Sequence, residues 1–168
     1  MEYSFRKATS DDLPQIWEIL QNAIARRKED GSEQWQDGYP NPEVIRKDIE
    51  ARAAFVMVRE DIIVGYCAIL INDEPAYESI QGKWLTDGDF VVFHRVAISE
   101  DHLGKGLSGK MLNFIEDLAG KNNINSVRAD TNFDNAAMLT VLRKAGYHYC
   151  GEVFFRGSPR MAFEKVIK

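Results

Sequence analysis

Residues 93–110 combine features that could bind an anion. An apolar, strand-like run leads into Gly104 and Gly106, and an amphipathic segment follows. Such a turn opens a helix N-terminus, where several backbone N–H groups point at one spot and the helix dipole favours negative charge. Glycine lets a ligand approach the backbone without a Cβ in the way, and Lys105 or Lys110 could add positive charge. The spacing therefore suits a pyrophosphate group.

Other functions can use a glycine turn, and some turns only connect a strand to a helix. The chain lacks the glycine spacing of a dinucleotide-binding turn and the Gly-Lys-Ser/Thr of a P-loop. NAD chemistry and nucleotide hydrolysis are therefore disfavoured. A nucleotide-binding module that uses the same turn stays open as an alternative.

His94 is the candidate for moving a proton. It lies in the strand-like run two residues before Val96, and regular strand alternation would place His94, Val96 and Ile98 on one face. A free imidazole has a pKa near 6.5, which suits proton transfer at neutral pH. The alternative is a histidine with a satisfied hydrogen bond in the core. Three carboxylates near loop or strand ends are further candidates for a base: Glu78, Asp130 and Glu152.

Composition narrows the class of protein. The formal net charge is -5 and no dense run of Lys and Arg occurs, so nucleic acid is not expected as a partner. No apolar stretch approaches the roughly 18 residues that cross a bilayer, and residues 1–7 do not resemble a targeting segment, so we expect no membrane association and a cytoplasmic location. Cys67 and Cys150 are predicted to be reduced, buried thiols, and no His, Cys and Asp cluster has metal-ligand spacing, so no metal is expected.

Hydrophobic periodicity predicts the elements that must position these residues. Chain length and the balance of 45% hydrophobic and 28% charged residues predict one globular domain over residues 1–168. Helices are predicted where apolar residues recur every three or four positions, at 13–30, 42–52, 106–121 and 135–145, and strands are predicted from Phe5 and at 55–58, 62–71, 90–98 and 127–131, with two more flanking Gly157.

The order strand, glycine turn, helix, strand after residue 90 predicts a βαβ unit with parallel strands and a right-handed crossover. Hairpins make up the rest. The fold class is therefore α/β, of the mixed α+β kind, with a mixed, mostly antiparallel central sheet of about seven strands and helices on both faces.

Two long loops carry exposed aromatic residues. Trp35 and Tyr39 lie in the loop over residues 31–42, and Tyr77 and Trp84 lie in the excursion over residues 72–89. Aromatic side chains in long loops can line a substrate pocket or fold back as lids on the core. We expect these four residues, with Asp130, to bind the acceptor substrate.

Two motifs resemble the GNAT superfamily of acyl-CoA-dependent N-acyltransferases. Its acyl-CoA loop reads Gln or Arg, two residues, Gly, any residue, then Gly or Ala, and here the matching positions are Leu103, Gly104, Lys105, Gly106, Leu107 and Ser108. Leu103 and Ser108 depart from the family residues. Residues 132–147 are similar to the family's Asn-containing turn, helix and closing Gly-Phe/Tyr, and the two motifs follow in the family's order.

The resemblance implies an N-acetyltransferase that transfers an acetyl group from acetyl-CoA to a primary amine of a small molecule, an amino acid or a peptide. It further implies that the backbone of Val96, Ala97 and Ile98 pairs with the pantetheine arm, that residues 103–108 hold the pyrophosphate, and that Asn135 binds CoA. A helix N-cap is the alternative for Asn135. A homodimer is possible for such a fold.

The family's general acid is not in its usual place. Many members carry a Tyr midway along the last helix, but the matching residue here is Leu142. Tyr147 or Tyr149, just beyond that helix, could replace it as the acid, or could simply pack in the core. The loss keeps a second function class open, an acyl-CoA-binding regulatory domain with weak or no catalysis.

Overall fold

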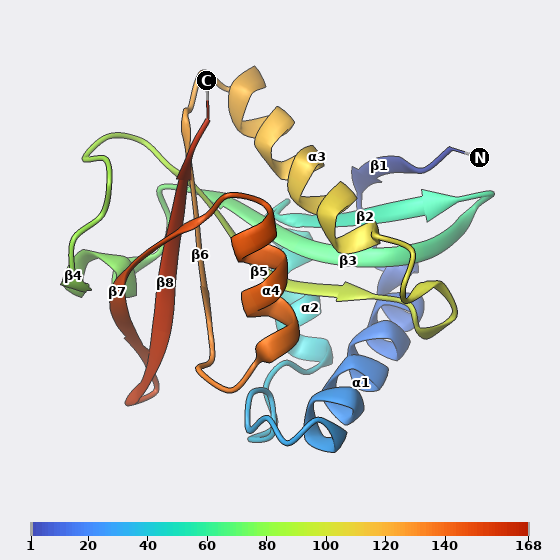
Figure 1. Ribbon diagram of the computed structural model, residues 1–168. Helices are drawn as coiled ribbons and strands as arrows, with labels where there is room; N and C mark the ends of the chain where they lie inside the picture. Colours follow the sequence, from blue (N-terminus) through green and yellow to red (C-terminus); the bar gives the residue numbers. More distant parts are fainter. Residues whose placement is uncertain (1, 168) are drawn as a thin grey trace. The chain divides into compact units, whose positions relative to one another are not determined.

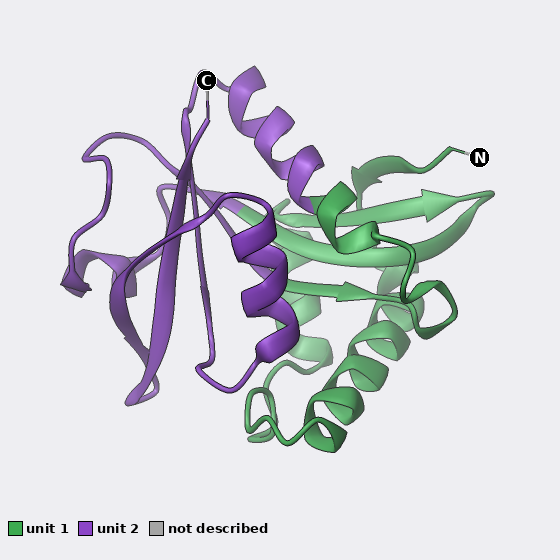
Figure 2. Cartoon of the chain, in the orientation of Figure 1, with its two compact units in different colours: residues 1–69, 95–111 green, residues 70–94, 112–168 purple. Residues whose placement is uncertain are grey.

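The computed structural model in Figure 1 describes residues 2–167. Contacts divide the chain into two compact units (Figure 2). Unit 1 contains Met1–Ile69 and Arg95–Met111, and unit 2 contains Leu70–His94 and Leu112–Lys168. The expectation of one domain over residues 1–168 stays a prediction.

Unit 1 is built from the N-terminal helices and a hairpin. Its part of the sheet is antiparallel, because β1 pairs with β2 and β2 pairs with β3. Its elements are β1 (Ser4–Lys7), the 3-10 turn η1 (Ser10–Asp12), α1 (Leu13–Glu29), α2 (Pro42–Glu50), β2 (Ala54–Arg59), most of β3 (Ile62–Ile71), the second half of β5 (Val91–Ile98), the 3-10 turn η3 (Glu100–His102) and the start of α3 (Leu107–Lys121).

Helix α1 follows the predicted amphipathic stripe. Its buried side chains are Ile16, Ile19, Leu20 and Ala23, which recur at helical spacing and pack into the core of unit 1. The chain enters it through η1, where Thr9 and Asp12 cap each other's backbone, so the regular helix begins at Leu13.

Unit 2 holds the C-terminal half of the sheet. Its elements are the first half of β5, the 3-10 turn η2 (Pro75–Ser79), β4 (Gln81–Gly82), the rest of α3, β6 (Ser126–Thr131), α4 (Ala136–Lys144), β7 (His148–Phe155) and β8 (Ser158–Val166). Strand β5 runs parallel to β6, with Val91 opposite Val127 and Val92 opposite Arg128, and α3 connects them. The predicted parallel strand–helix–strand unit is therefore confirmed.

The sheet has eight strands in the order β1-β2-β3-β5-β6-β8-β7-β4 and is mostly antiparallel, so the predicted mixed α/β class is confirmed. The strand beyond the predicted seven is β4, two residues long. It pairs with β7 where Gly82 faces Gly151. A Cβ on Gly82 would come within 2.2 Å of the Cys150 carbonyl oxygen, so glycine is required for this close approach.

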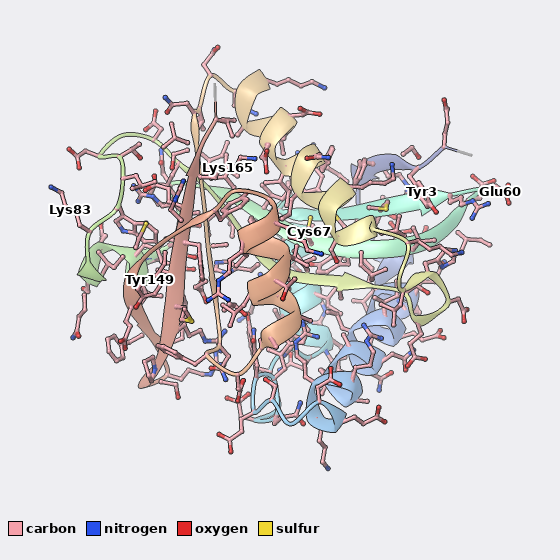
Figure 3. All side chains as sticks on the ribbon, viewed as in Figure 1. Tyr3, Glu60, Cys67, Lys83, Tyr149 and Lys165 are labelled. Atoms are coloured by element: carbon pink, nitrogen blue, oxygen red, sulfur yellow. The ribbon has the colours of Figure 1, made fainter. Side chains whose placement is uncertain are left out.

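The two cysteines are free and buried, as predicted. Cys67 lies on β3 (Figure 3) and Cys150 on β7. None of the helices within residues 2–167 is both long enough and apolar enough to cross a bilayer.

Candidate active site

The glycine turn before α3 has the geometry of an anion site. Gly104 and Gly106 have φ 77° and φ 72°, in the left-handed region that favours glycine, and a Cβ on either would meet no atom within 4 Å. The turn is therefore open to a ligand. The first N–H groups of the 15-residue helix α3, which starts at Leu107, have no intrahelical acceptor and carry the positive end of its dipole. These features fit a pyrophosphate.

The strand leading into this turn is buried. Val96, Ala97 and Ile98 are at most 6% exposed. Arg26 donates from Nη2 to the Ile98 carbonyl oxygen at 3.2 Å, so this carbonyl is already paired and a pantetheine arm would pair with other backbone groups of the strand. The regular alternation that would place His94, Val96 and Ile98 on one face does not hold, because Arg95 between them has φ 57°, outside the extended region.

Arg95 is held by a buried polar network in unit 1. Its Nε and Nη2 donate to the two oxygens of Asp48 at 2.9 and 2.6 Å, and its Nη1 donates to the Tyr39 hydroxyl. Tyr66 donates its hydroxyl to Asp48 at 2.6 Å. Burial lowers the pKa of Arg95, but the charges of Tyr39 and Asp48 outweigh it and raise that pKa overall. Tyr39, which was expected to bind substrate, is thus part of the hydrogen-bond network that holds Arg95.

Trp35, the other aromatic of the first loop, packs in the core of unit 1. The Arg27 guanidinium lies 3.9 Å from the centre of its ring. Burial, followed by the charge of Arg26, lowers the pKa of Arg27 to about 10. These contacts favour the lid interpretation over a substrate-binding role for Trp35.

In unit 2, His94 lies between two carboxylates. Its Nε2 is 2.8 Å from Glu74 Oε2 and its Nδ1 is 3.9 Å from Asp130 Oδ2. Because an ionised carboxylate only accepts hydrogen bonds, Nε2 carries the proton and donates it to Glu74. Nδ1 is then the basic nitrogen. The side chains of His94 and Glu74 are each 14% exposed, so both are accessible to a small molecule.

Asp130 is fixed by its neighbours. The Tyr77 hydroxyl donates to Asp130 Oδ2 at 2.7 Å, and Arg160 Nη1 lies 3.7 Å from Oδ1. Burial, followed by the charge of Asp130, raises the pKa of Tyr77 well above its usual value, so the hydroxyl stays a donor. Tyr77 and Asp130, both predicted to bind substrate, therefore lie together beside His94.

A cavity of about 430 Å³ lies along the excursion over residues 72–90. Trp84 lines it, and its Nε1 donates to the Tyr77 carbonyl at 3.0 Å. Glu74 lines the same cavity, so one carboxylate serves both the cavity and His94. Glu78 also lines the cavity, whereas Glu152 is placed on β7 opposite Gln81 and Met161.

The candidates for a general acid lie elsewhere. Tyr147 is 4% exposed, and its hydroxyl donates to Glu116 Oε2 at 3.2 Å, while Lys165 (Figure 3) pairs with the other oxygen. Burial and the charge of Glu116 raise the pKa of Tyr147. This arrangement favours a structural role for Tyr147. Tyr149 is 53% exposed on β7 (Figure 3), and Leu142 is fully buried in α4.

Asn135 is the N-cap of α4. Its side-chain oxygen accepts from the Met138 backbone N–H at 3.1 Å, so the capping interpretation is confirmed, and CoA binding by Asn135 stays a prediction. For metals, no group of three His, Cys, Asp or Glu residues with suitable placement is found within residues 2–167.

Sequence analysis missed Glu74 and Asp48. Glu74 lies 20 residues from His94 and Asp48 lies 47 residues from Arg95, so no local spacing links either carboxylate to its partner. The only signal at Glu74 is that it precedes Pro75 and caps η2, where its side chain accepts from the Ala76 N–H.

Comparisons with known proteins identify the family of the chain. The profile of the acetyltransferase (GNAT) family matches residues 15–147. A GNAT family acetyltransferase from Streptococcus agalactiae is 35% identical, with a TM-score of 0.90 over 99% of this chain and 96% of its own. No curated protein matches the chain.

More distant structures share the fold. An acetyltransferase of the GNAT family from Listeria monocytogenes is 21% identical with a TM-score of 0.80, covering 99% of this chain and 96% of its own. An acetyltransferase from Salmonella typhimurium, solved with its cofactor acetyl-CoA, is 18% identical with a TM-score of 0.70, covering 100% of this chain and 95% of its own. The glycine turn, the parallel strand–helix–strand unit and the family match lead to one conclusion: the chain belongs to the GNAT family of acetyltransferases.

Proposed function

We propose that the chain transfers an acetyl group from acetyl-CoA directly to a primary amine of a small molecule, an amino acid or a peptide, with both substrates bound together. The observation that carries this proposal is the His94–Glu74 pair, with 2.8 Å between Nε2 and Oε2. It supplies an imidazole of fixed tautomer on β5, the strand that continues into the glycine turn.

The glycine turn is the part of the chain that would hold the donor. The backbone N–H groups of residues 104–108 suit the pyrophosphate, and the Salmonella neighbour binds acetyl-CoA in the same fold. Acetyl-CoA supplies a thioester whose carbonyl carbon accepts the amine. A thiol pKa of about 8.5 makes CoA a fair leaving group, so the absence of a tyrosine at Leu142 does not prevent turnover.

His94 Nδ1 would take the proton that the acceptor must lose. A lysine-like ammonium has a pKa of about 10 and cannot attack until it is neutral. After transfer, the imidazolium lies between the carboxylates of Glu74 and Asp130, which stabilise its charge. The amine nitrogen forms the bond to the acetyl carbon, and the carbon–sulfur bond breaks with its electron pair on the CoA sulfur. The further proton that the nitrogen loses on becoming an amide balances the proton that the departing thiolate takes up.

The test is release of free CoA thiol against a panel of amines, amino acids and peptides. We expect His94→Ala to lower kcat about 10²- to 10⁴-fold, the usual contribution of a positioned base, and to leave acetyl-CoA affinity measured by calorimetry unchanged. A wild-type rate that does not change between about pH 6 and 9 would rule out His94 as the base.

The glycine turn has its own test. Gly106→Val should abolish acetyl-CoA binding, because valine disfavours φ 72° and its side chain occupies the open side of the turn. Gly120→Ala is the control, since Gly120 lies near the other end of α3, also faces open space and has no left-handed φ. Retained affinity in Gly106→Val would overturn the pyrophosphate assignment.

A second function is an acyl-CoA-binding regulatory domain. Leu142 favours it, because this side chain is fully buried at the position where many family members carry a catalytic tyrosine. Acetyl-CoA binding by calorimetry without thiol release on any acceptor would support this function over the enzyme.

A further inference from the structure

The cavity in unit 2 has the size and lining of a small-molecule site. Its volume of about 430 Å³ falls within the range of roughly 300 to 1,000 Å³ that is typical of such sites. The aromatic rings of Tyr77, Trp84 and Phe90 form its apolar walls. Polar groups of opposite charge share the lining, and their placement indicates which ligand fits.

Arg128 is the buried positive group of this cavity. Its side chain is 6% exposed, and its guanidinium carbon lies 4.3 Å from the ring centres of both Trp84 and Phe90. Nε donates to Glu164 at 3.2 Å and Nη2 donates to the Thr86 carbonyl at 2.7 Å. Nη1 makes no hydrogen bond or ion pair anywhere in residues 2–167. A rigidly held guanidinium with one unused nitrogen, Nη1, is prepared to donate to an acceptor oxygen.

Carboxylates supply the negative groups. Glu74 lines the cavity and also holds His94, and Asp73, Glu78 and Asp87 add exposed carboxylates around it. Glu164 already offsets the charge of Arg128. The lining thus holds four carboxylates against two cations, Arg128 and Lys83, so the cavity attracts an ammonium group and disfavours a ligand with several negative charges, such as a phosphate.

The cavity brings the two kinds of charged group together. Arg128 and Glu74 both line it, and Glu74 is also the hydrogen-bond partner of His94. An oxygen bound at Arg128 and an amine bound at Glu74 would therefore belong to one molecule that fits the cavity.

We propose that this cavity binds a free amino acid as the acceptor, with its carboxylate on Arg128 Nη1 and its ammonium at Glu74, the carboxylate that also holds His94. The role of the amino acid as acceptor rests on the proposed acetyl transfer. Its binding rests on the cavity alone. A peptide N-terminus lacks the nearby carboxylate, and a polyamine lacks any group for Arg128.

The test uses the common amino acids that carry a primary amino group. Each amino acid is compared with its own carboxamide. In thiol release with acetyl-CoA, we expect the best amino acid to exceed its amide at least tenfold in kcat/KM, because the amide loses a charge-assisted hydrogen bond. Calorimetry of the same pair without acetyl-CoA measures binding independently of catalysis. Spermidine is included as the polyamine probe.

Two variants assign the groups. Arg128→Lys keeps a positive charge beside Glu164 but loses Nη1, and it should reduce the preference for acid over amide to about twofold or less. Glu78→Gln, at an exposed position, should raise KM for acid and amide alike by a few-fold and leave the preference intact. It keeps the test decisive if Arg128→Lys does not fold.

The outcomes separate the two proposals. Equal use of acid and amide, or preferred use of spermidine, overturns the amino-acid assignment and leaves the acetyltransferase standing. If no acceptor is acetylated, the proposed function fails, and calorimetric binding of an amino acid but not its amide would still support the cavity assignment. An absence of both turnover and binding overturns it.

Discussion

His94 and Arg95 are consecutive residues of β5 whose charges are handled in opposite ways. In unit 1, Arg95 has a left-handed backbone conformation, and its three side-chain nitrogens donate hydrogen bonds to Asp48 and Tyr39. In unit 2, His94 makes one short contact, to Glu74, and leaves Nδ1 3.9 Å from Asp130. The Arg95 guanidinium is fixed in place because each of its three nitrogens is bound. The His94 imidazole has one nitrogen that makes no hydrogen bond to the described part of the chain, and this nitrogen could accept a proton.

The difference follows from the energetics of buried charge. A buried ion pair is tolerated when further hydrogen bonds complete it, and the Tyr66 hydroxyl does this for Asp48. Burial, followed by the charge of Asp48, raises the pKa of Tyr66, so its hydroxyl stays protonated and remains a donor to Asp48. We infer that the Asp48–Arg95 network is structural and the Glu74–His94 pair is chemical.

Breaking the structural network should have the largest effect. Asp48→Ala leaves the Arg95 guanidinium buried without its partner, and we expect a loss of about 3–5 kcal/mol in the free energy of unfolding by urea. The control is Glu43→Ala on the same helix, whose ion pair with Arg46 is about half exposed, with an expected change below about 1 kcal/mol. Similar small losses in both variants would mean that Arg95 is not locked by Asp48.

Unit 2 has its own structural pair, and its stability should depend on pH. Glu164 is fully buried and accepts from Leu85, Thr86, Ser126 and Arg128. Burial raises its pKa, but these hydrogen bonds and the Arg128 charge lower it overall. Since the folded state prefers the ionised form, the stabilisation is present above about pH 5 and is lost as the pH falls through the usual glutamate pKa of about 4.3 and below.

Glu164→Gln should remove that pH dependence. We expect a loss of about 1–3 kcal/mol at pH 7 and a smaller difference from wild type near pH 3, measured by urea unfolding at both values. A variant whose loss grows on acidification would show that the protonated form is the one the fold prefers.

The chemical pair should show a smaller effect, and in rate more than in stability. Glu74→Gln keeps the size of the side chain but no longer fixes the imidazole tautomer or stabilises its charged form, so we expect kcat to fall about tenfold, equivalent to ~1.4 kcal/mol. A structural role would change the unfolding free energy and leave the pH profile of kcat intact. The expected result is an altered pH profile with acetyl-CoA affinity retained, and partial rescue by Glu74→Asp.

The contrast also explains how much could be read from the sequence. Helix α1 and strands β3, β5 and β6 were predictable, because their apolar residues repeat at the period of the element that buries them. Strand β4 was not, since its two residues form a strand only because Gly82 and Gly151 allow two backbones to meet. A helix or strand that buries one face has a periodic apolar pattern in its sequence. A strand that forms only through a contact with a distant segment has no such pattern.

The site divides in the same way. The glycine turn and His94 lie within one short segment, so residue type and order are enough to propose them as site residues. The partners that decide each role, Glu74 for His94 and Asp48 for Arg95, come from distant segments, and the left-handed φ of Arg95 has no signature in its residue type. The sequence could therefore suggest a candidate base, but it could not show which charged side chain is held by several partners and which has a nitrogen left open.

Tyr147 gives the smallest expected effect and the sharpest check on that distinction. Its hydroxyl donates to Glu116, which Lys165 also holds, so Tyr147→Phe should cost about 0.5–1.5 kcal/mol of unfolding free energy and leave kcat unchanged. Paired urea unfolding and thiol-release measurements test both halves. A fall in kcat with stability intact would instead place Tyr147 with His94 among the residues that act in the reaction.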